Sequence, residues 1–304
     1  MKTIPFVPAC QNMEEIQKLA VLITDFIHPE MIVLFGRYAG MPSYDIRGGY
    51  ELLILTANQL AVGVKEVMGC LAMNFPEKDR KEPYLSLHLL TVVFVHHHSS
   101  QSHFLYTIRK EGVLLYKNES CKLKDKVCYK PVRSYRQAEG YSDQCLALGR
   151  AFLQDARRQQ QSGIPRMSAF YLSQAATQFF RAAAFVHYGF IPEQKEDLLM
   201  TYLRIRHCSA GMAGLWKGER ELSEWRLFGR LQSFSYKARY SYPFTVDSDL
   251  LACCMDCVVK TEKVVGDFCA SWHIFGLDQC NRRLPISALS VGISSMLIGA
   301  IPAC

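Results

Sequence analysis

Basic residues and tyrosines alternate in the segment from Arg109 to Arg136. Nine Lys and Arg residues stand there against three acidic ones, so this segment holds +6 of the chain's formal +7. Cations that follow phosphates and rings that stack on bases together bind single-stranded nucleic acid. We therefore expect a nucleic-acid-binding segment, with an ordinary solvated linker as the alternative. The candidate contact residues are Lys122, Lys124, Lys126, Tyr129, Lys130, Arg133 and Arg136.

Cysteine and histidine residues offer metal chemistry at two places. Cys254 and Cys257 form one C-x-x-C pair without a second pair, whereas a structural zinc site takes four ligands. The run His96–His98 follows an expected strand and precedes His103. We interpret the thiols as buried in a helix and the histidines as solvated loop residues, so no metal site is predicted.

The composition limits the class of protein. With 304 residues, 49% of them hydrophobic and 21% charged, the chain is neither a disordered protein nor a multispan membrane protein. Twelve scattered cysteines and the lack of a secretory signal predict reduced thiols and a cytoplasmic location. The segment Leu284–Cys304 is uncharged, but Pro285 and Pro302 leave too few residues between them to span a bilayer. We expect no membrane partner.

Helices and short strands alternate in the first part of the chain. This pattern predicts an α/β domain with a small mixed sheet over residues 1–118. The expected elements are helix Met13–Ile27, strand Met31–Phe35, strand Tyr50–Leu55, helix Ala57–Phe75, strand Leu85–Val95, a helix from Phe104 to the break at Gly112, and strand Val113–Tyr116.

The second part of the chain lacks strand patterns almost entirely. Apolar residues recur at helical spacing, which predicts an all-α up-down bundle over residues 141–272. A basic linker over residues 119–140 is expected before it, and a tail over residues 273–304 after it, uncharged from Leu284 onward. The expected helices are Asp143–Gln161, Ser168–Tyr188, Lys195–Cys208, Leu222–Arg239 and Leu250–Trp272.

Three segments resemble the minimal nucleotidyltransferase domain of the polymerase-β-like superfamily. They are Ile32–Gly40, Tyr50–Leu55 and Phe104–Tyr116. The first two are similar to that family's strand and Gly-Ser turn, followed by its Asp-x-Asp strand. The resemblance implies a nucleotidyltransferase-like fold for the first domain.

The second half resembles the HEPN domain, a helical partner of such nucleotidyltransferases. The similar segments are Ala169–Ala182, Gly189–Pro192, Asp197–Leu199 and Ala238–Tyr240. Such a fusion implies a toxin–antitoxin or stress and defence setting. Because helical bundles of this kind often dimerise, we expect a homodimer.

The carboxylates that nucleotidyl transfer needs are largely missing. The resemblance implies two metal ions held by two acids on one strand and a third on its neighbour. Gly49 and Glu51 stand at the first two positions, and strand Leu85–Val95 has no Asp or Glu. Asp45 is a weak loop substitute. We therefore predict a degenerate site. It would bind Mg²⁺ only if it is active, and otherwise no cofactor is expected. Glu51 is then expected to be a solvated or ion-paired residue at the end of its strand.

The turn after the first strand still offers a phosphate cradle. Its backbone N–H groups and the cation of Arg37, which replaces the family's Ser, both attract anions. We predict Gly36, Arg37 and Glu51 as nucleotide-binding residues, with a purely structural turn as the alternative.

Many HEPN proteins are metal-independent ribonucleases that use an Arg–His pair. Arg181 and His187 match that spacing, but on one helix their side chains lie about 120° apart. No catalytic residue is therefore assigned, and Glu51, Asp45, Arg181 and His187 remain weak candidates. The sequence favours a degenerate fusion acting as a nucleotide- or RNA-binding module. The alternatives are an active metal-independent HEPN ribonuclease and a structural or dimerising protein without a ligand.

Overall fold

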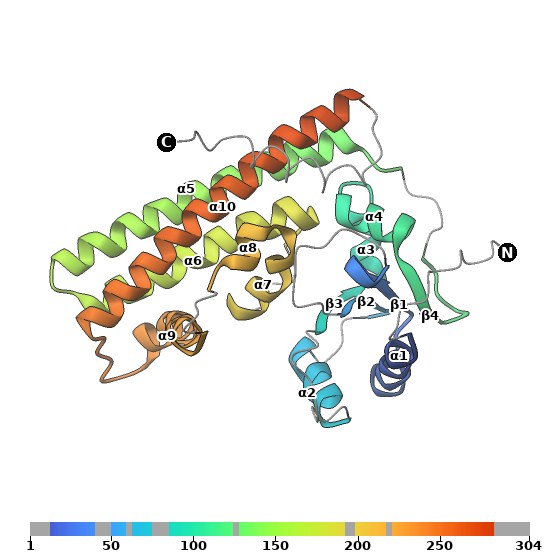
Figure 1. Ribbon diagram of the computed structural model, residues 1–304, viewed down its shortest axis with the longest axis horizontal. Helices are drawn as coiled ribbons and strands as arrows, with labels where there is room; N and C mark the ends of the chain where they lie inside the picture. Colours follow the sequence, from blue (N-terminus) through green and yellow to red (C-terminus); the bar gives the residue numbers. More distant parts are fainter. Residues whose placement is uncertain are drawn as a thin grey trace, which may run out of the picture. The chain divides into compact units, whose positions relative to one another are not determined.

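The computed structural model describes residues 13–39, 50–58, 63–74, 85–123, 128–191, 198–216 and 221–282 (Figure 1). The chain divides into two compact units, Met1–Tyr129 and Lys130–Cys304. All strands of the described chain lie in the first unit, which we call the α/β unit, whereas the second, the helical unit, consists of packed helices. The fold class predicted from the sequence is confirmed.

A four-stranded mixed sheet forms the centre of the α/β unit. Its strands are β1 (Met31–Phe35), β2 (Tyr50–Thr56), β3 (Leu85–Thr91) and β4 (Val113–Lys117), in the order β3-β2-β1-β4. β1 pairs antiparallel with β2 and β4, while β2 pairs parallel with β3. The predicted small mixed sheet is thus correct, and β1 and β2 occupy its middle.

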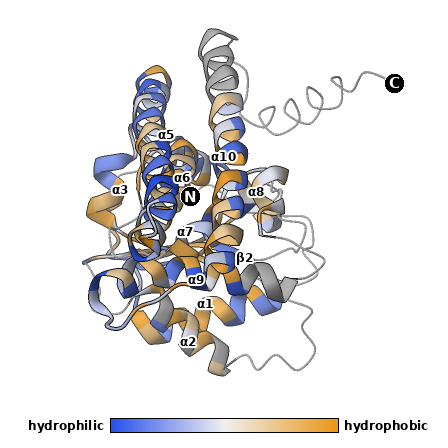
Figure 2. Cartoon of the chain, turned by 90° about the vertical axis from the view of Figure 1, so that its left-hand side faces the viewer, coloured by the Kyte–Doolittle hydropathy of each residue, from blue (hydrophilic) through white to orange (hydrophobic). Residues whose placement is uncertain are grey.

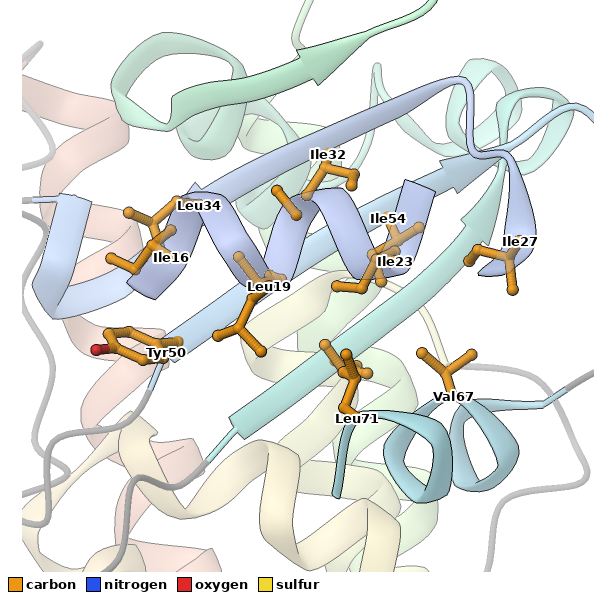
Figure 3. Packing of buried hydrophobic residues seen from close by; sticks show 13 residues of the cluster. Ile16, Leu19, Ile23, Ile27, Ile32, Leu34, Tyr50, Ile54, Val67 and Leu71 are labelled. Carbon is orange, nitrogen blue, oxygen red and sulfur yellow. The ribbon is translucent and has the colours of Figure 1, made fainter. Parts of the chain in front are cut away.

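One face of this sheet carries the apolar core. Helix α1 (Met13–Ile27) directs its three- and four-spaced residues, including Ile16 and Ile23, onto the alternate side chains of the strands, such as Ile32 and Ile54 (Figure 3). Helix α2 (Val64–Asn74) adds Val67 and Leu71 to the same cluster. The expected start of this helix at Ala57 is wrong, because α2 begins at Val64.

The opposite face holds the other set of alternate side chains. Helices α3 (Val92–His98) and α4 (His103–Glu111) cover it (Figure 1). Phe104 of α4 packs edge-on against Phe35 of β1, with ring centroids 5.2 Å apart. This face therefore differs from the first because it also contains polar residues of β2 and β3.

The strand expected over Leu85–Val95 ends four residues early. Thr91 is the last residue of β3, and its hydroxyl accepts a hydrogen bond from the backbone N–H of Phe94 at 3.0 Å, so it caps α3. Val92 and Val95, three residues apart, are buried by the new helix. Capping and burial thus outweigh the strand preference of this β-branched run. Consequently His96–His98 lie in a helix and not, as expected, in a loop.

The helical unit is organised around one buried helix. Helix α6 (Pro165–Tyr188) packs against α5, α7, α9 and α10, and side chains such as Phe179 and Ala183 are fully buried. A helix that is apolar on most sides belongs inside a bundle. The other elements of this unit are α5 (Pro131–Gln161), α7 (Leu198–Ile205), the short turn η2 (Arg206–Cys208), α8 (Ala210–Gly214), α9 (Glu221–Tyr240) and α10 (Ser248–Arg282).

Helix α5 begins twelve residues before the expected Asp143, at Pro131. A proline fits the first turn of a helix, and the side chains of Tyr135 and Ala138 in the early turns are buried. Residues 131–140 of the expected linker are therefore helical. In Figure 2 much of the α5 ribbon is blue, the colour of hydrophilic residues, which explains why the sequence shows little apolar pattern there.

Helix α10 likewise extends beyond the expected Trp272 to Arg282. The uncharged segment Leu284–Cys304 lies outside the described residues. No helix in the described part of the chain is long and apolar enough to cross a membrane.

Candidate functional site

Glu51, the strand residue predicted to contribute to nucleotide binding, lies in a buried row across the sheet. The register places Phe35 of β1, Glu51 of β2 and Ser86 of β3 side by side. Glu51 is 5% exposed and Ser86 is 4% exposed. The solvated alternative predicted for Glu51 is therefore wrong, because β1, β3 and the covering helices exclude water from this part of the sheet, whereas the ion-paired alternative stays a prediction.

Gly36 follows Phe35 of this row, and the structure does not accommodate another residue at its position. Its φ is +71°, a conformation that L residues rarely adopt, and it opens the short turn η1 (Gly36–Ala39). A Cβ atom placed on Gly36 would lie 1.3 Å from Oε2 of Glu51. The carboxylate thus occupies the space directly beside the turn, where the nucleotide phosphates were expected.

Aromatic side chains close the site from the same face. The ring of Phe35 lies 5.3 Å from that of His88 and 5.2 Å from that of Phe104, and His88 and Phe104 are 5.4 Å apart. His88 is 1% exposed. An aromatic cluster of this kind stabilises the contact between the sheet and α4.

The row does not bring together the acids that a two-metal reaction needs. Ser86 stands beside Glu51 where a third carboxylate would be required, and its hydroxyl oxygen is buried without a hydrogen-bond partner. Within the described ranges, no group of three or more His, Cys, Asp or Glu residues is arranged to hold a metal ion. Sequence reasoning identified the missing acid but not Ser86, which only the strand register places there.

Two other predicted residues of this site give no geometry. The backbone of Arg37 belongs to η1, but its side chain is not described, and Asp45 lies outside the described residues. The phosphate cradle of Gly36 and Arg37 therefore stays a prediction.

The Arg181–His187 pair does not form a joint site. Nη2 of Arg181 donates to the hydroxyl of Tyr141 on α5 at 3.3 Å, and the Tyr141 ring stacks on Phe185 at 4.1 Å. His187 packs edge-on against Tyr188 with ring centroids 4.7 Å apart. On a helix the two positions are separated by about 9 Å of rise and about 120° of rotation, so their side chains leave the helix in different directions.

The contact between α5 and α6 also contains a thiol. Cys145 is buried, and desolvation is the main cause that raises the pKa of Cys145 and of the neighbouring Tyr141 hydroxyl. Arg181 acts against both shifts through its charge. These groups therefore hold their protons near neutral pH and serve as packing and hydrogen-bonding groups.

The predicted nucleic-acid contacts are distributed over both units. Lys122 is exposed in the α/β unit, and Lys130, Arg133 and Arg136 are exposed at the start of α5 in the helical unit. Tyr129 is half-buried, and its ring stacks on Tyr106 at 4.6 Å. Lys124 and Lys126 lie outside the described residues.

The burial predicted for the two thiols is confirmed for Cys254, whereas Cys257 is half-buried; among the histidines predicted to be solvated, His97 is exposed. Cys254 is buried in α10, and desolvation raises its pKa to about 12, so its thiol stays protonated. His98, in contrast, is half-buried in α3, where it stacks on Phe94 at 4.2 Å and burial lowers its pKa.

Two arginines of the helical unit are buried. Arg204 and Arg206 are 5% and 6% exposed. The hydroxyl of Tyr188 donates to the backbone carbonyl of Arg204 at 2.6 Å. No pattern in the sequence indicates this burial, because arginine is rarely found inside a protein.

No protein-family model matches the sequence, and no curated protein matches it. Among solved structures, the chain is similar to the crystal structure of a nucleotidyltransferase-like protein from Exiguobacterium sibiricum 255-15. The match has 12% identity and a TM-score of 0.29, and covers 92% of this chain and 89% of that chain.

Proposed function

We propose that this chain is a catalytically degenerate nucleotidyltransferase–HEPN fusion that binds single-stranded RNA without cleaving it. The observation that carries the proposal is the cation stripe, which we define as Lys130, Arg133 and Arg136 at the start of α5. All three are exposed, with Lys130 at the N-cap and the two arginines in the first turns of α5; at a spacing of three residues, each neighbouring pair lies about 60° apart around the helix axis. Such a row of cations matches the repeating phosphates of a nucleic-acid strand.

The helix dipole strengthens the attraction of the cation stripe for anions. The first turn of α5 contains no acidic residue, although acids are the residues that favour this position. The positive end of the dipole and the three cations therefore repel one another until an anion binds. The stripe is also rigid, because Tyr135 packs against Trp272 of α10 with ring centroids 4.7 Å apart.

Catalysis by the α/β unit is less favoured than binding. Glu51 is one carboxylate packed against Gly36, and Ser86 offers no second negative charge beside it. Binding of a free nucleotide at Gly36, Arg37 and Glu51 is also disfavoured, because the buried carboxylate repels phosphate. For ribonuclease activity, Arg181 and His187 do not face each other. The homodimer and the toxin–antitoxin or defence setting stay predictions.

The proposal is tested with fluorescently labelled single-stranded RNA in EDTA, followed by fluorescence anisotropy and by gel electrophoresis of the RNA. The wild-type protein should bind the RNA and leave it intact. Reversing two charges with Arg133→Glu and Arg136→Glu should weaken binding at least about tenfold. It should also reduce the slope of log K against log[salt] by about 1.4, since each phosphate contact on a single strand contributes about 0.7.

The matched control reverses two exposed charges with the same spacing on another helix. Lys260 and Lys263 of α10 are both exposed, so Lys260→Glu with Lys263→Glu changes the net charge equally without touching the stripe. Equal losses in both variants would reduce the effect to general attraction and contradict the proposal. If the wild-type protein cleaves the RNA and the His187→Ala variant leaves it intact, the chain is a ribonuclease and the proposal is wrong.

A further inference from the structure

The end of α9 displays tyrosine rings to solvent. Tyr236, Tyr240 and Tyr242 are 65%, 66% and 93% exposed. We call these residues, together with Arg239, the tyrosine platform. Single exposed apolar residues are common on proteins, but several exposed aromatic rings at one place mark an interaction site.

The rings of the platform are ordered relative to one another. Tyr236 and Tyr240 are one helical turn apart, and their ring centroids are separated by 5.1 Å. The guanidinium carbon of Arg239 lies 5.2 Å from the Tyr240 ring and 5.8 Å from the ring of Phe170 on α6. Cation–π contacts at these distances fix both the charge and the ring.

Hydrogen bonds hold Arg239 in place and leave part of it available. Its Nε donates to the backbone carbonyl of Ser235 at 2.9 Å, and its Nη2 donates to the Ser235 hydroxyl at 3.1 Å. In the described chain Nη1 has no hydrogen-bond partner, and the residue is exposed. A guanidinium group with one free edge binds a phosphate oxygen without further ordering.

Two hydrogen bonds from helix α6 hold the part of α9 that carries the platform. Nε of Arg166 donates to the backbone carbonyl of Ala238 at 2.7 Å, and Nε2 of Gln174 donates to the Ser235 hydroxyl at 3.1 Å. Both bonds join α6 to the last turns of α9. Because these turns are fixed before a ligand arrives, binding costs less conformational entropy.

The charge around the rings is of one sign. From Trp225 to Val246 the sequence has no Asp or Glu but contains Arg226, Arg230, Lys237 and Arg239. The next acid, Asp247, accepts a hydrogen bond from the backbone N–H of Leu250 at 3.0 Å and so caps α10. Exposed rings among uncompensated cations are the combination that single-stranded nucleic acid requires.

We propose that the tyrosine platform binds single-stranded nucleic acid by stacking bases on Tyr240 and Tyr242 while Arg239 contacts a phosphate. A second copy of this chain is a poorer occupant. Two-fold symmetric dimers bring the same patch of each copy together, which would place Arg239 and Lys237 against their own equivalents. A nucleic-acid strand instead supplies both the flat rings and the negative charge.

The platform is separate from the cation stripe and does not depend on it. Helix α5 has 31 residues and is therefore about 46 Å long. The stripe lies at its first turn, whereas the platform lies beside the start of α6, which follows the end of α5 by a short turn (Figure 1). A strand long enough to reach both places uses both, so the loss of either one weakens its binding, whereas a short oligonucleotide occupies only one of them.

The test measures binding of labelled uridine and deoxythymidine oligomers to the full chain by fluorescence anisotropy. Tyr240→Leu with Tyr242→Leu removes the rings but keeps apolar side chains, and should weaken binding about tenfold or more. Tyr240→Phe with Tyr242→Phe keeps the rings and should bind within about twofold of the wild type. The salt slope should stay unchanged in both, whereas Arg239→Gln should lower it by about 0.7.

The outcomes separate this proposal from the cation stripe. Loss of affinity in the leucine variant but not in the Arg133→Glu, Arg136→Glu variant supports the platform even where the stripe fails. Equal affinities of the leucine, phenylalanine and wild-type proteins for both oligomers would overturn it. It is also overturned if light scattering shows a dimer that only the leucine variant loses while oligomer binding is unchanged.

Discussion

The two units differ in where their candidate functional side chains lie. In the α/β unit, Glu51 and Ser86 are buried in the sheet and covered by α3 and α4. In the helical unit, the cation stripe and the tyrosine platform face solvent. A buried polar group is shielded from a ligand by its own protein, whereas an exposed one that is held in place can bind something else. The segments that resemble the nucleotidyltransferase motif thus contain the polar groups that solvent does not reach.

The largest effect is expected where the buried row meets the turn. Gly36→Ala should lower the free energy of unfolding of the α/β unit by about 3 kcal/mol, because it adds left-handed backbone strain to a clash with Glu51. Hydrogen exchange of β1 and β2, followed by mass spectrometry, measures the loss of protection. All three tryptophans lie in the helical unit, so their fluorescence transition should not move.

The control is Gly69→Ala on α2, where an added Cβ meets nothing within 4 Å. It should be neutral or slightly stabilising. A Gly36→Ala protein as well protected as this control would show that Glu51 can move out of the row, and the site would then be open to a ligand.

Acid should destabilise the α/β unit through one histidine. Desolvation lowers the pKa of His103 to about 4. The unfolded chain, with an ordinary pKa near 6.5, binds the proton first, so stability present above pH 6.5 is lost as the pH falls toward 4. Because the ring is half-buried, we expect a loss of about 2 kcal/mol, measured by hydrogen exchange of α4. The variant His103→Gln should remove most of this pH dependence; an unchanged dependence would assign it to other groups.

The glycines of α5 test how tightly the helical unit is packed. A Cβ on Gly149 would lie 2.5 Å from Cε1 of the buried Phe179 ring, whereas one on Gly140 meets nothing within 4 Å. Gly149→Ala should therefore destabilise the unit by about 1 kcal/mol, since overpacking exceeds the gain in helix propensity. Gly140→Ala should stabilise it by up to about 1 kcal/mol. Urea unfolding followed by tryptophan fluorescence compares them, and equal stabilities would contradict close α5–α6 packing.

The smallest effect is expected at an exposed ion pair. Nε of Arg150 on α5 lies 2.8 Å from Oε1 of Glu262 on α10. Arg150→Gln should lower the free energy of unfolding of the helical unit by less than about 1 kcal/mol, and the difference should shrink in high salt. A larger, salt-independent loss would mean that the pair is more deeply desolvated than its exposure indicates.

Particular elements show how far the sequence could be interpreted. The bounds of α1 were predicted correctly because its apolar residues recur every three or four positions. The strand Leu85–Val95 was predicted too long, because the hydroxyl of Thr91 caps a helix that residue preferences did not indicate. The start of α5 was missed because its first turns are mostly polar, and their burial depends on Trp272 about 140 residues later in the chain.

The sequence by itself determined the α/β order followed by helices, the basic segment and the shortage of strand carboxylates, because periodicity, charge and residue type are local properties. Only the tertiary structure decided that Glu51 is buried beside Ser86 and against Gly36, and that the tyrosines of α9 face solvent around Arg239. The physical reason is that burial depends on partners contributed by distant segments. A tyrosine or a glutamate has the same letter in the sequence whether a helix covers it or not.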